Sequence, residues 1–115
     1  MNGENVPAKS NDETMTPVTM LPAVDIMDGN DGVTIWFEVP GANSGTSEVE
    51  VKDRILTVKA SSSLKRNGRP VLFKRTFQLT DGADVEKISA KSCDGVLTLT
   101  IPKSDRAKVH RIKVS

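Results

Sequence analysis

Residues that commonly carry chemistry are scarce in this chain. Its 115 residues include one cysteine, one histidine and no tyrosine. Cys93 therefore has no partner for an intrachain disulfide, which fits a reducing compartment. His110 lies in a basic segment five residues from the C-terminus, where a preorganised catalytic base is not expected. No phosphate-binding glycine loop and no Cys/His metal spacing occurs. We therefore expect no catalytic residue, no metal site and no cofactor.

Long apolar runs are also absent. No run approaches the roughly 20 residues that are needed to span a bilayer. The first residues, MNGENVPAKSNDETMT, lack the apolar stretch of a secretory signal. Lys and Arg number 16 against 15 Asp and Glu, so the formal net charge is only +1 and long-range attraction to anionic surfaces is weak. These features favour a cytoplasmic protein with no membrane partner.

One stretch of the chain has bases but no acids. Residues 54–79 contain no Asp or Glu and several Lys and Arg, so they could in principle contact phosphates. Only Phe73 and Phe77 are interleaved with these cations, and both fall on the face of a strand that is predicted to be buried. Base stacking is therefore not expected. A solvated face or a partner-binding edge is the stronger interpretation, and we expect no nucleic-acid partner.

Apolar and polar residues alternate between residues 22 and 101. Residues 33–39 and 96–101 show the alternation most clearly, which predicts strands with one buried face. Further predicted strands cover residues 23–27, 48–51, 55–58, 71–79 and 87–91. Three Asx-Gly pairs separate apolar runs, as tight hairpins require: Asp31-Gly32, Asn67-Gly68 and Asp94-Gly95. Short strands at this density predict an all-β fold, an immunoglobulin-like antiparallel β-sandwich of seven to eight strands.

The sequence outside this alternating region forms two tails. Residues 1–20 are polar and show neither apolar period, so we expect a short flexible arm. The sandwich domain is expected over residues 21–103. Residues 104–115 form a C-terminal extension that is expected to be flexible, and residues 102–115 carry five Lys and Arg against one Asp.

The predicted strand 71–79 contains one residue that breaks its pattern. Val71, Phe73, Phe77 and Leu79 share one parity, and Arg75 lies on the same parity. A guanidinium removed from water without a partner is strongly disfavoured. Arg75 must therefore meet a carboxylate, backbone carbonyls or a second subunit, or else extend its charged end to solvent. The sequence leaves these alternatives open.

The C-terminal residues contain a second unusual feature. Ile112 and Val114 lie two residues apart at the end of a basic linker, so in an extended segment they point the same way. Docked in an apolar groove, each would contribute roughly 1.5 to 3 kcal/mol before the cost of ordering the linker. The pair could join subunits in this way, or it could close the fold as a last strand of its own subunit.

These residues resemble the small heat-shock proteins, the family built on the α-crystallin domain. The most specific segment is AKSCDGVLTLTIPK at residues 90–103, which resembles the family's alanine, Asn/Asp-Gly-Val-Leu motif and strand-ending Pro-Lys. Further matches are PAVDI at residues 22–26, VPG at 39–41, FKRTF at 73–77 and IKV at 112–114. The resemblance covers residues 21–114, most of the chain.

The resemblance implies roles for particular residues. Ile112 and Val114 correspond to the C-terminal motif that inserts into a groove of a neighbouring subunit. Carried over by position, that groove is lined by Val49, Val51, Ile88 and Ala90. Phe73 and Arg75 correspond to the strand near the dimer interface. Dimers in the family form either by exchange of a long loop or by side-by-side strand pairing, and both possibilities remain open here.

The resemblance also implies a function. Members of the family are ATP-independent holdases that bind partly unfolded proteins and prevent their aggregation. The expected partners are other copies of this chain, in dimers and higher oligomers, and unfolded client proteins. The alternative is an adaptor or co-chaperone that binds one folded partner and has no general holdase activity.

Overall fold

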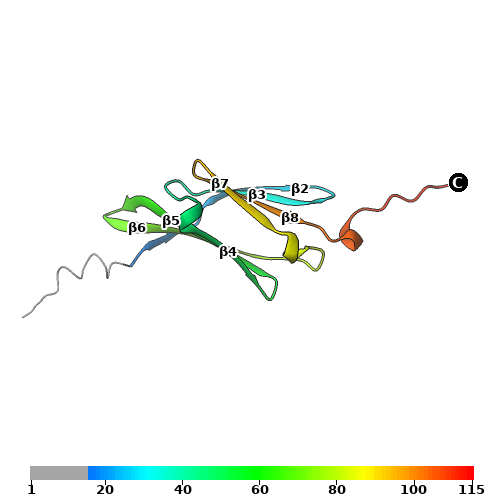
Figure 1. The fold of residues 1–115 in the computed structure, drawn as a ribbon, viewed down its shortest axis with the longest axis horizontal. Helices are drawn as coiled ribbons and strands as arrows, with labels where there is room; N and C mark the ends of the chain where they lie inside the picture. Colours follow the sequence, from blue (N-terminus) through cyan, green and yellow to red (C-terminus); the bar gives the residue numbers. More distant parts are fainter. Residues whose placement is uncertain (1–15) are drawn as a thin grey trace, which may run out of the picture.

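The computed structural model describes residues 16–115, which fold into two four-stranded sheets packed face to face (Figure 1). The strands are β1 Val18–Met20, β2 Ala23–Asp28, β3 Gly32–Glu38, β4 Ser47–Lys52, β5 Ile55–Arg66, β6 Arg69–Gln78, β7 Ser89–Cys93 and β8 Val96–Pro102. Three short 3-10 helices are η1 Ser44–Thr46, η2 Val85–Lys87 and η3 Asp105–Ala107. The expected all-β sandwich is confirmed.

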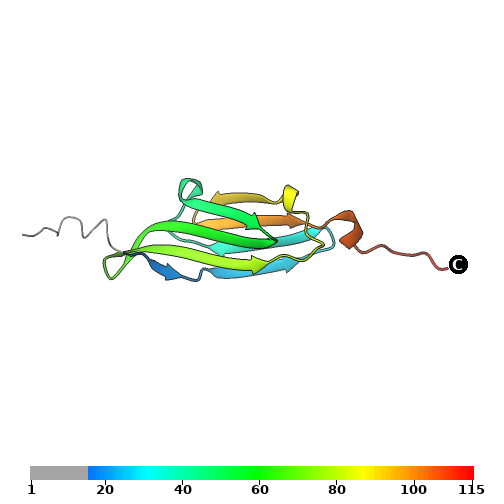
Figure 2. The ribbon, with the colours of Figure 1, turned by 90° about the horizontal axis from the view of Figure 1, so that it is seen from below.

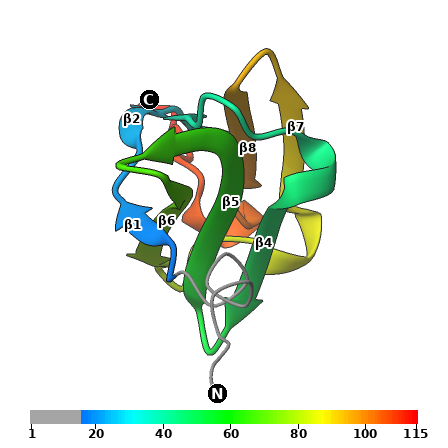
Figure 3. The same ribbon diagram turned by 90° about the vertical axis from the view of Figure 1, so that its left-hand side faces the viewer.

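The strand order of each sheet determines which strands lie at its edges, and these edge strands border the candidate functional site. One sheet has the order β1-β6-β5-β4 and the other has the order β2-β3-β8-β7. Every pairing is antiparallel except that of β1 with β6, which is parallel. Viewed along the sandwich, β4 and β7 lie on one side, and β1 and β2 lie on the other (Figure 3).

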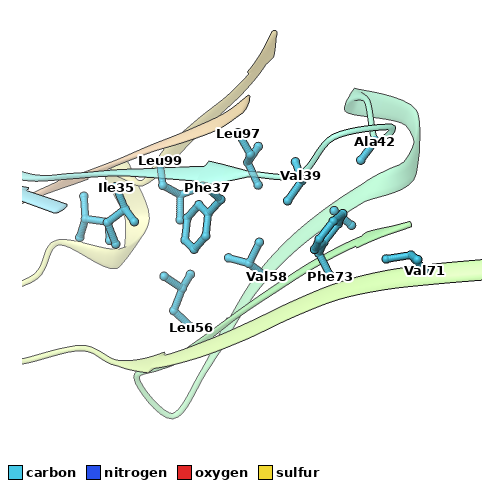
Figure 4. Packing of buried hydrophobic residues seen from close by; sticks show 12 residues of the cluster. Ile35, Phe37, Val39, Ala42, Leu56, Val58, Val71, Phe73, Leu97 and Leu99 are labelled. Carbon is cyan, nitrogen blue, oxygen red and sulfur yellow. The ribbon is translucent and has the colours of Figure 1, made fainter. Parts of the chain in front are cut away.

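The alternating residues of the central strands build the core between the sheets (Figure 4). Phe37, Leu56 and Leu99 are fully buried, and each contributes roughly 1.5 to 3 kcal/mol through loss of apolar contact with water. The ring of Phe37 meets that of Phe77 edge-on, with centroids 5.9 Å apart and ring planes at 67°. The predicted inward faces of residues 33–39 and 96–101 are confirmed.

Strand β1 is an element that the sequence analysis missed. Residues Val18, Thr19 and Met20 pair with β6, within the arm that we expected to be flexible up to residue 20. Three residues are too few to show a period, and the strand exists because β6 offers its outer edge. Arg69 also anchors the chain there, since its Nε donates to the carbonyl of Thr16 at 2.9 Å. The expected flexibility of residues 1–15 lies outside the described residues.

Strands β5 and β6 form a longer hairpin than predicted. Asn67 and Gly68 make its two-residue turn, with φ values of 52° and 75°, so the strands continue beyond the apolar residues to Arg66 and Arg69. Their register shifts between Ser62 and Lys65. The turn at Pro40-Gly41 compensates for this bulge, because Ser63 donates its backbone N–H to Gly41 and Ser62 donates its hydroxyl to Pro40.

The predicted strand 87–91 is displaced by two residues. Lys87 closes a 3-10 turn by donating its N–H to the carbonyl of Asp84 at 3.1 Å, and the strand begins at Ser89. It ends at Cys93, where the Asp94-Gly95 turn leads into β8 with φ values of 51° and 78°. Ile88 therefore lies just before β7 rather than within it.

Candidate functional site

Strands β4 and β7 are the two sheet edges on one side of the sandwich (Figure 3). An apolar groove runs between them. Its larger part has a volume of about 410 Å³ and is lined by Val49, Glu50, Val51, Val85, Ile88, Ser89 and Ala90. A second part of about 300 Å³ shares Val49 and Ala90 and reaches Leu97. The structure thus brings together all four groove residues that were named from the sequence.

The groove exists because neither edge strand is covered. In β4, Val49 and Val51 face inward and remain half-buried, while the residues between them are exposed. Across the groove, Ala90 presents only a methyl group and is exposed, so the space above it stays open. The result is a strip of accessible apolar surface beside two strand edges.

Arg54 positions one end of this groove, and sequence reasoning missed it. It lies at the tip of the β4–β5 turn with φ of 62°. Its guanidinium donates to the carbonyl of Thr80 and, at 2.7 Å, to that of Ala83. Arg54 also accepts the N–H of Leu79 on its own carbonyl at 2.8 Å. These bonds hold the segment that leads into η2, and η2 carries the groove residue Val85.

The C-terminal tail starts from a fixed point and then leaves the sandwich (Figures 1 and 2). Asn30 accepts the N–H of Val109 at 2.7 Å through its side-chain oxygen, and His110 contacts the carbonyl of Asp105 at 3.0 Å. The extension is therefore held up to about residue 110, whereas we expected it to be flexible from residue 104.

The apolar pair in the tail is free of its own subunit. Ile112 is 86% exposed and Val114 is 89% exposed. Residues 108–115 form no strand, so the alternative in which the pair closes its own fold is wrong. Both side chains remain available to another molecule.

The outer edge of β6 is only partly covered. Strand β1 pairs with Val71–Phe73, so within residues 16–115 the β6 edge from residue 74 to residue 78 has no strand beside it. Phe73, expected at the dimer interface, is 8% exposed and belongs to the core. Its side chain therefore lies behind this edge rather than on it.

Arg75 is the charged residue on the inner face of β6. Its guanidinium carbon lies 5.2 Å from the centre of the Phe77 ring, and the residue is half-buried. In residues 16–115 no carboxylate lies within ion-pair distance of it. Of the alternatives that the sequence left open, the isolated subunit provides only partial exposure to solvent. The contact with the Phe77 ring was not among them.

Other kinds of site find no support in the described part of the chain. Residues 16–115 contain no group of three metal-ligating side chains. None of their helices has the length and apolar character required to cross a membrane. Cys93 is exposed next to the β7–β8 turn. The groove and the tail are thus the features on which a function can rest.

Comparison with known proteins decides the family. The family model described as "Hsp20/alpha crystallin family" matches residues 25–115. The chain belongs to this family. Small heat-shock proteins are non-enzymatic chaperones, so the family suggested by the sequence motifs and the expectation that the chain is not an enzyme are both confirmed.

Individual known proteins resemble the chain over most of its length. The "18 kDa antigen 2" of Mycobacterium avium is 36% identical over an alignment of 108 residues that covers 84% of this chain and 78% of that protein. The "18 kDa heat shock protein" of Streptomyces albus G is 33% identical over 88% of this chain and 77% of its own length. A small heat-shock protein structure from Xylella fastidiosa matches with a TM-score of 0.66 and 29% identity, covering 84% and 97% of the two chains.

Proposed function

We propose that this chaperone is an ATP-independent holdase whose subunits assemble through their C-terminal tails. The observation that carries the proposal is the pairing of an open apolar groove along β4 and β7 with a tail that presents Ile112 and Val114 to solvent. A free subunit gains nothing from either surface. Both apolar surfaces are removed from water when the tail of one subunit occupies the groove of another.

The strength of a single tail contact fits an assembly that exchanges subunits. Ile112 and Val114 would each contribute roughly 1.5 to 3 kcal/mol on burial, and ordering the tail offsets part of this. Because residues up to 110 are already held, only the last few residues must be ordered. Two tails in a dimer act together through effective concentration. The related Xylella fastidiosa structure is described as "a distinct high order structure", which supports assembly beyond a dimer.

The dimer itself is proposed to form side by side through the free part of the β6 edge, residues 74–78. Two copies pairing there would cover the backbone groups that β1 leaves exposed, and Arg75 would meet the second subunit. The other possibility, a dimer formed by loop exchange, would need a long loop between β5 and β6. These strands are instead joined by the two-residue turn Asn67-Gly68. Phe73 would support this interface from the core.

Clients are proposed to bind through apolar surface that the sandwich leaves exposed. A hollow of about 190 Å³ between the sheets, on the side away from β4 and β7, is lined by Ile26, Val33, Phe77 and Leu79 among others. Ile26 itself is 56% exposed. Partly unfolded chains expose apolar segments that compete for such surface. No nucleotide is needed for this, and an exposed free cysteine fits the cytoplasm as the place of action.

The holdase proposal is tested by light scattering of two unrelated proteins heated with and without this chaperone. We expect suppression of aggregation for both. Failure with both, together with stoichiometric capture of one folded cellular partner, would instead establish the adaptor alternative and contradict the holdase.

A further inference from the structure

The charges beside the groove differ between its two strand edges. On β4, the exposed Glu48 and Glu50 alternate with the half-buried Val49 and Val51, and Glu50 also borders the groove. On β7, the charged residue is Lys91, which is exposed and points away from the groove lining. One edge is therefore acidic and the other basic.

The tail has the complementary pattern. Arg111 and Lys113 alternate with Ile112 and Val114, so an extended tail presents two apolar side chains on one face and two cations on the other. All four residues are exposed. The tail therefore has the same two-residue spacing of apolar and charged side chains as β4, and its charges are positive where those of β4 are negative.

We propose that the tail of a second copy of this chain adds as a strand to the free edge of β4, not β7, and that Arg111 and Lys113 select this edge by lying opposite Glu48 and Glu50. The proposal rests on the tail docking proposed above and assigns its place and its selectivity. A single register seats Ile112 and Val114 over the groove and brings both cations opposite both carboxylates. This register is parallel: it sets Ile112 and Val114 opposite Val49 and Val51, and Arg111 and Lys113 opposite Glu48 and Glu50. An antiparallel tail with Ile112 and Val114 opposite the same two valines would instead bring Arg111 opposite Lys52, where like charges destabilise the pairing.

The neighbours of these carboxylates support the assignment. In the sheet register, Glu48 lies opposite Lys59 and Glu50 lies opposite Thr57 of β5, so Glu50 has no cation beside it across the strand pair. Neither carboxylate belongs to an ion pair within residues 16–115. Opposite charges on adjacent strands stabilise their pairing, while like charges destabilise it.

The other charges around the groove do not reverse the proposed preference of the tail for the β4 edge. On η2, Glu86 and Lys87 have opposite signs, and Lys87 lies 3.8 Å from the carboxylate of Asp84. Lys52 ends β4 beyond the groove residue Val51. A tail along β7 would instead bring its cations towards Lys91.

Charge reversal in the full-length chain tests the proposal. Light scattering across a concentration series gives the concentration at half assembly. We expect Glu48→Lys/Glu50→Lys to raise this concentration about tenfold, and Arg111→Glu/Lys113→Glu to raise it by a similar factor. The chain with all four changes is expected to recover to within about threefold of the original, because the charges are again complementary. Absence of this recovery would overturn the proposal.

Two controls separate charge selection from a general surface effect. Lys91→Glu on β7 is expected to change the half-assembly concentration less than twofold, and a larger change than the β4 pair produces would place the tail on β7. The neutral pair Glu48→Gln/Glu50→Gln covers the case in which the reversed chain does not fold. It is expected to assemble more weakly than the original chain in low salt and equally well in about 1 M salt, where screening acts within roughly 3 Å. Equal assembly in low salt would also contradict the proposal.

The failure of this inference differs from the failure of tail docking itself. If Ile112→Ala/Val114→Ala disrupts assembly but the charge variants do not, docking stands and charge selection is wrong. If neither set of changes alters assembly, both are wrong.

Discussion

Arg75 shows how a single side chain can indicate an interface. It occupies a position where its neighbours on the same face, Phe73 and Phe77, are apolar, and within its own subunit it meets the Phe77 ring rather than a carboxylate. A cation over an aromatic face is stabilised by roughly 0.5 to 2 kcal/mol, depending on its exposure. The guanidinium of Arg75 is thus only partly compensated within its own subunit, and it lies beside a free strand edge. The second subunit of the proposed side-by-side dimer would supply the remaining contacts.

Arg75→Ala is therefore expected to weaken dimerisation more than Lys74→Ala. Arginines buried at interfaces are frequent hot spots, so we expect the dimer dissociation constant to rise about tenfold for Arg75→Ala and less than threefold for Lys74→Ala, whose side chain lies on the outer face. Analytical ultracentrifugation measures both. Equal effects of the two changes would count against Arg75 as an interface residue.

At the scale of elements, the alternating strands could be predicted and the short or irregular ones could not. The inward faces of β3 and β8 follow from period two alone, because both strands are central and half-buried. Strand β1 depends on an edge that β6 provides, and the extension of β5 through Ser61–Ser63 depends on bonds from the Pro40-Gly41 turn. Neither of these interactions with distant residues produces a pattern in the local sequence from which the strand could be predicted.

The candidate site was predictable to a similar extent. Val49, Val51, Ile88 and Ala90 were found through resemblance to a family, and they do line one groove. Arg54 was missed because its role arises from carbonyls 26 and 29 residues away in sequence. Phe73 was placed at an interface, but the inward pleat of β6 and the pairing with β1 put it in the core.

Arg54→Ala is expected to loosen the segment between β6 and η2. The charged hydrogen bonds to Thr80 and Ala83 would be lost from a partly exposed side chain, so the free energy of unfolding should fall by about 1 to 2 kcal/mol. Arg54→Lys keeps the charge but not the forked geometry, and it should give an intermediate value. Urea titration measures both, and a stability of Arg54→Ala equal to that of the original chain would contradict the role.

Ala90→Gln is expected to obstruct the groove from the β7 side. The longer side chain would occupy the space that Ala90 leaves open, so assembly should weaken at least fivefold while the fold is kept, since residue 90 is exposed. Lys91→Gln places the same residue one position along with the opposite parity and should have less than twofold effect. Size-exclusion chromatography with light scattering compares them. If Ala90→Gln assembles as well as the original chain, the tail does not bind in this groove.

At the scale of the whole molecule, the sandwich has more accessible apolar surface than a lone subunit can use. The groove along β4 and β7, the exposed tail and the hollow near Ile26 are made of different residues of the subunit. The first two complement each other, which favours assembly, and the third remains for other chains. Self-association and client binding can therefore occur on separate surfaces of one subunit.

The most direct measurement is the mass distribution of Ile112→Ala/Val114→Ala, by light scattering over a range of concentrations. Val109→Ala is the matched control, because Val109 is 71% exposed in the same extension but lies outside the paired motif. We predict that the double variant falls to the mass of a dimer while the control keeps the mass of the original assembly. A double variant with an unchanged mass distribution would contradict assembly through the tail.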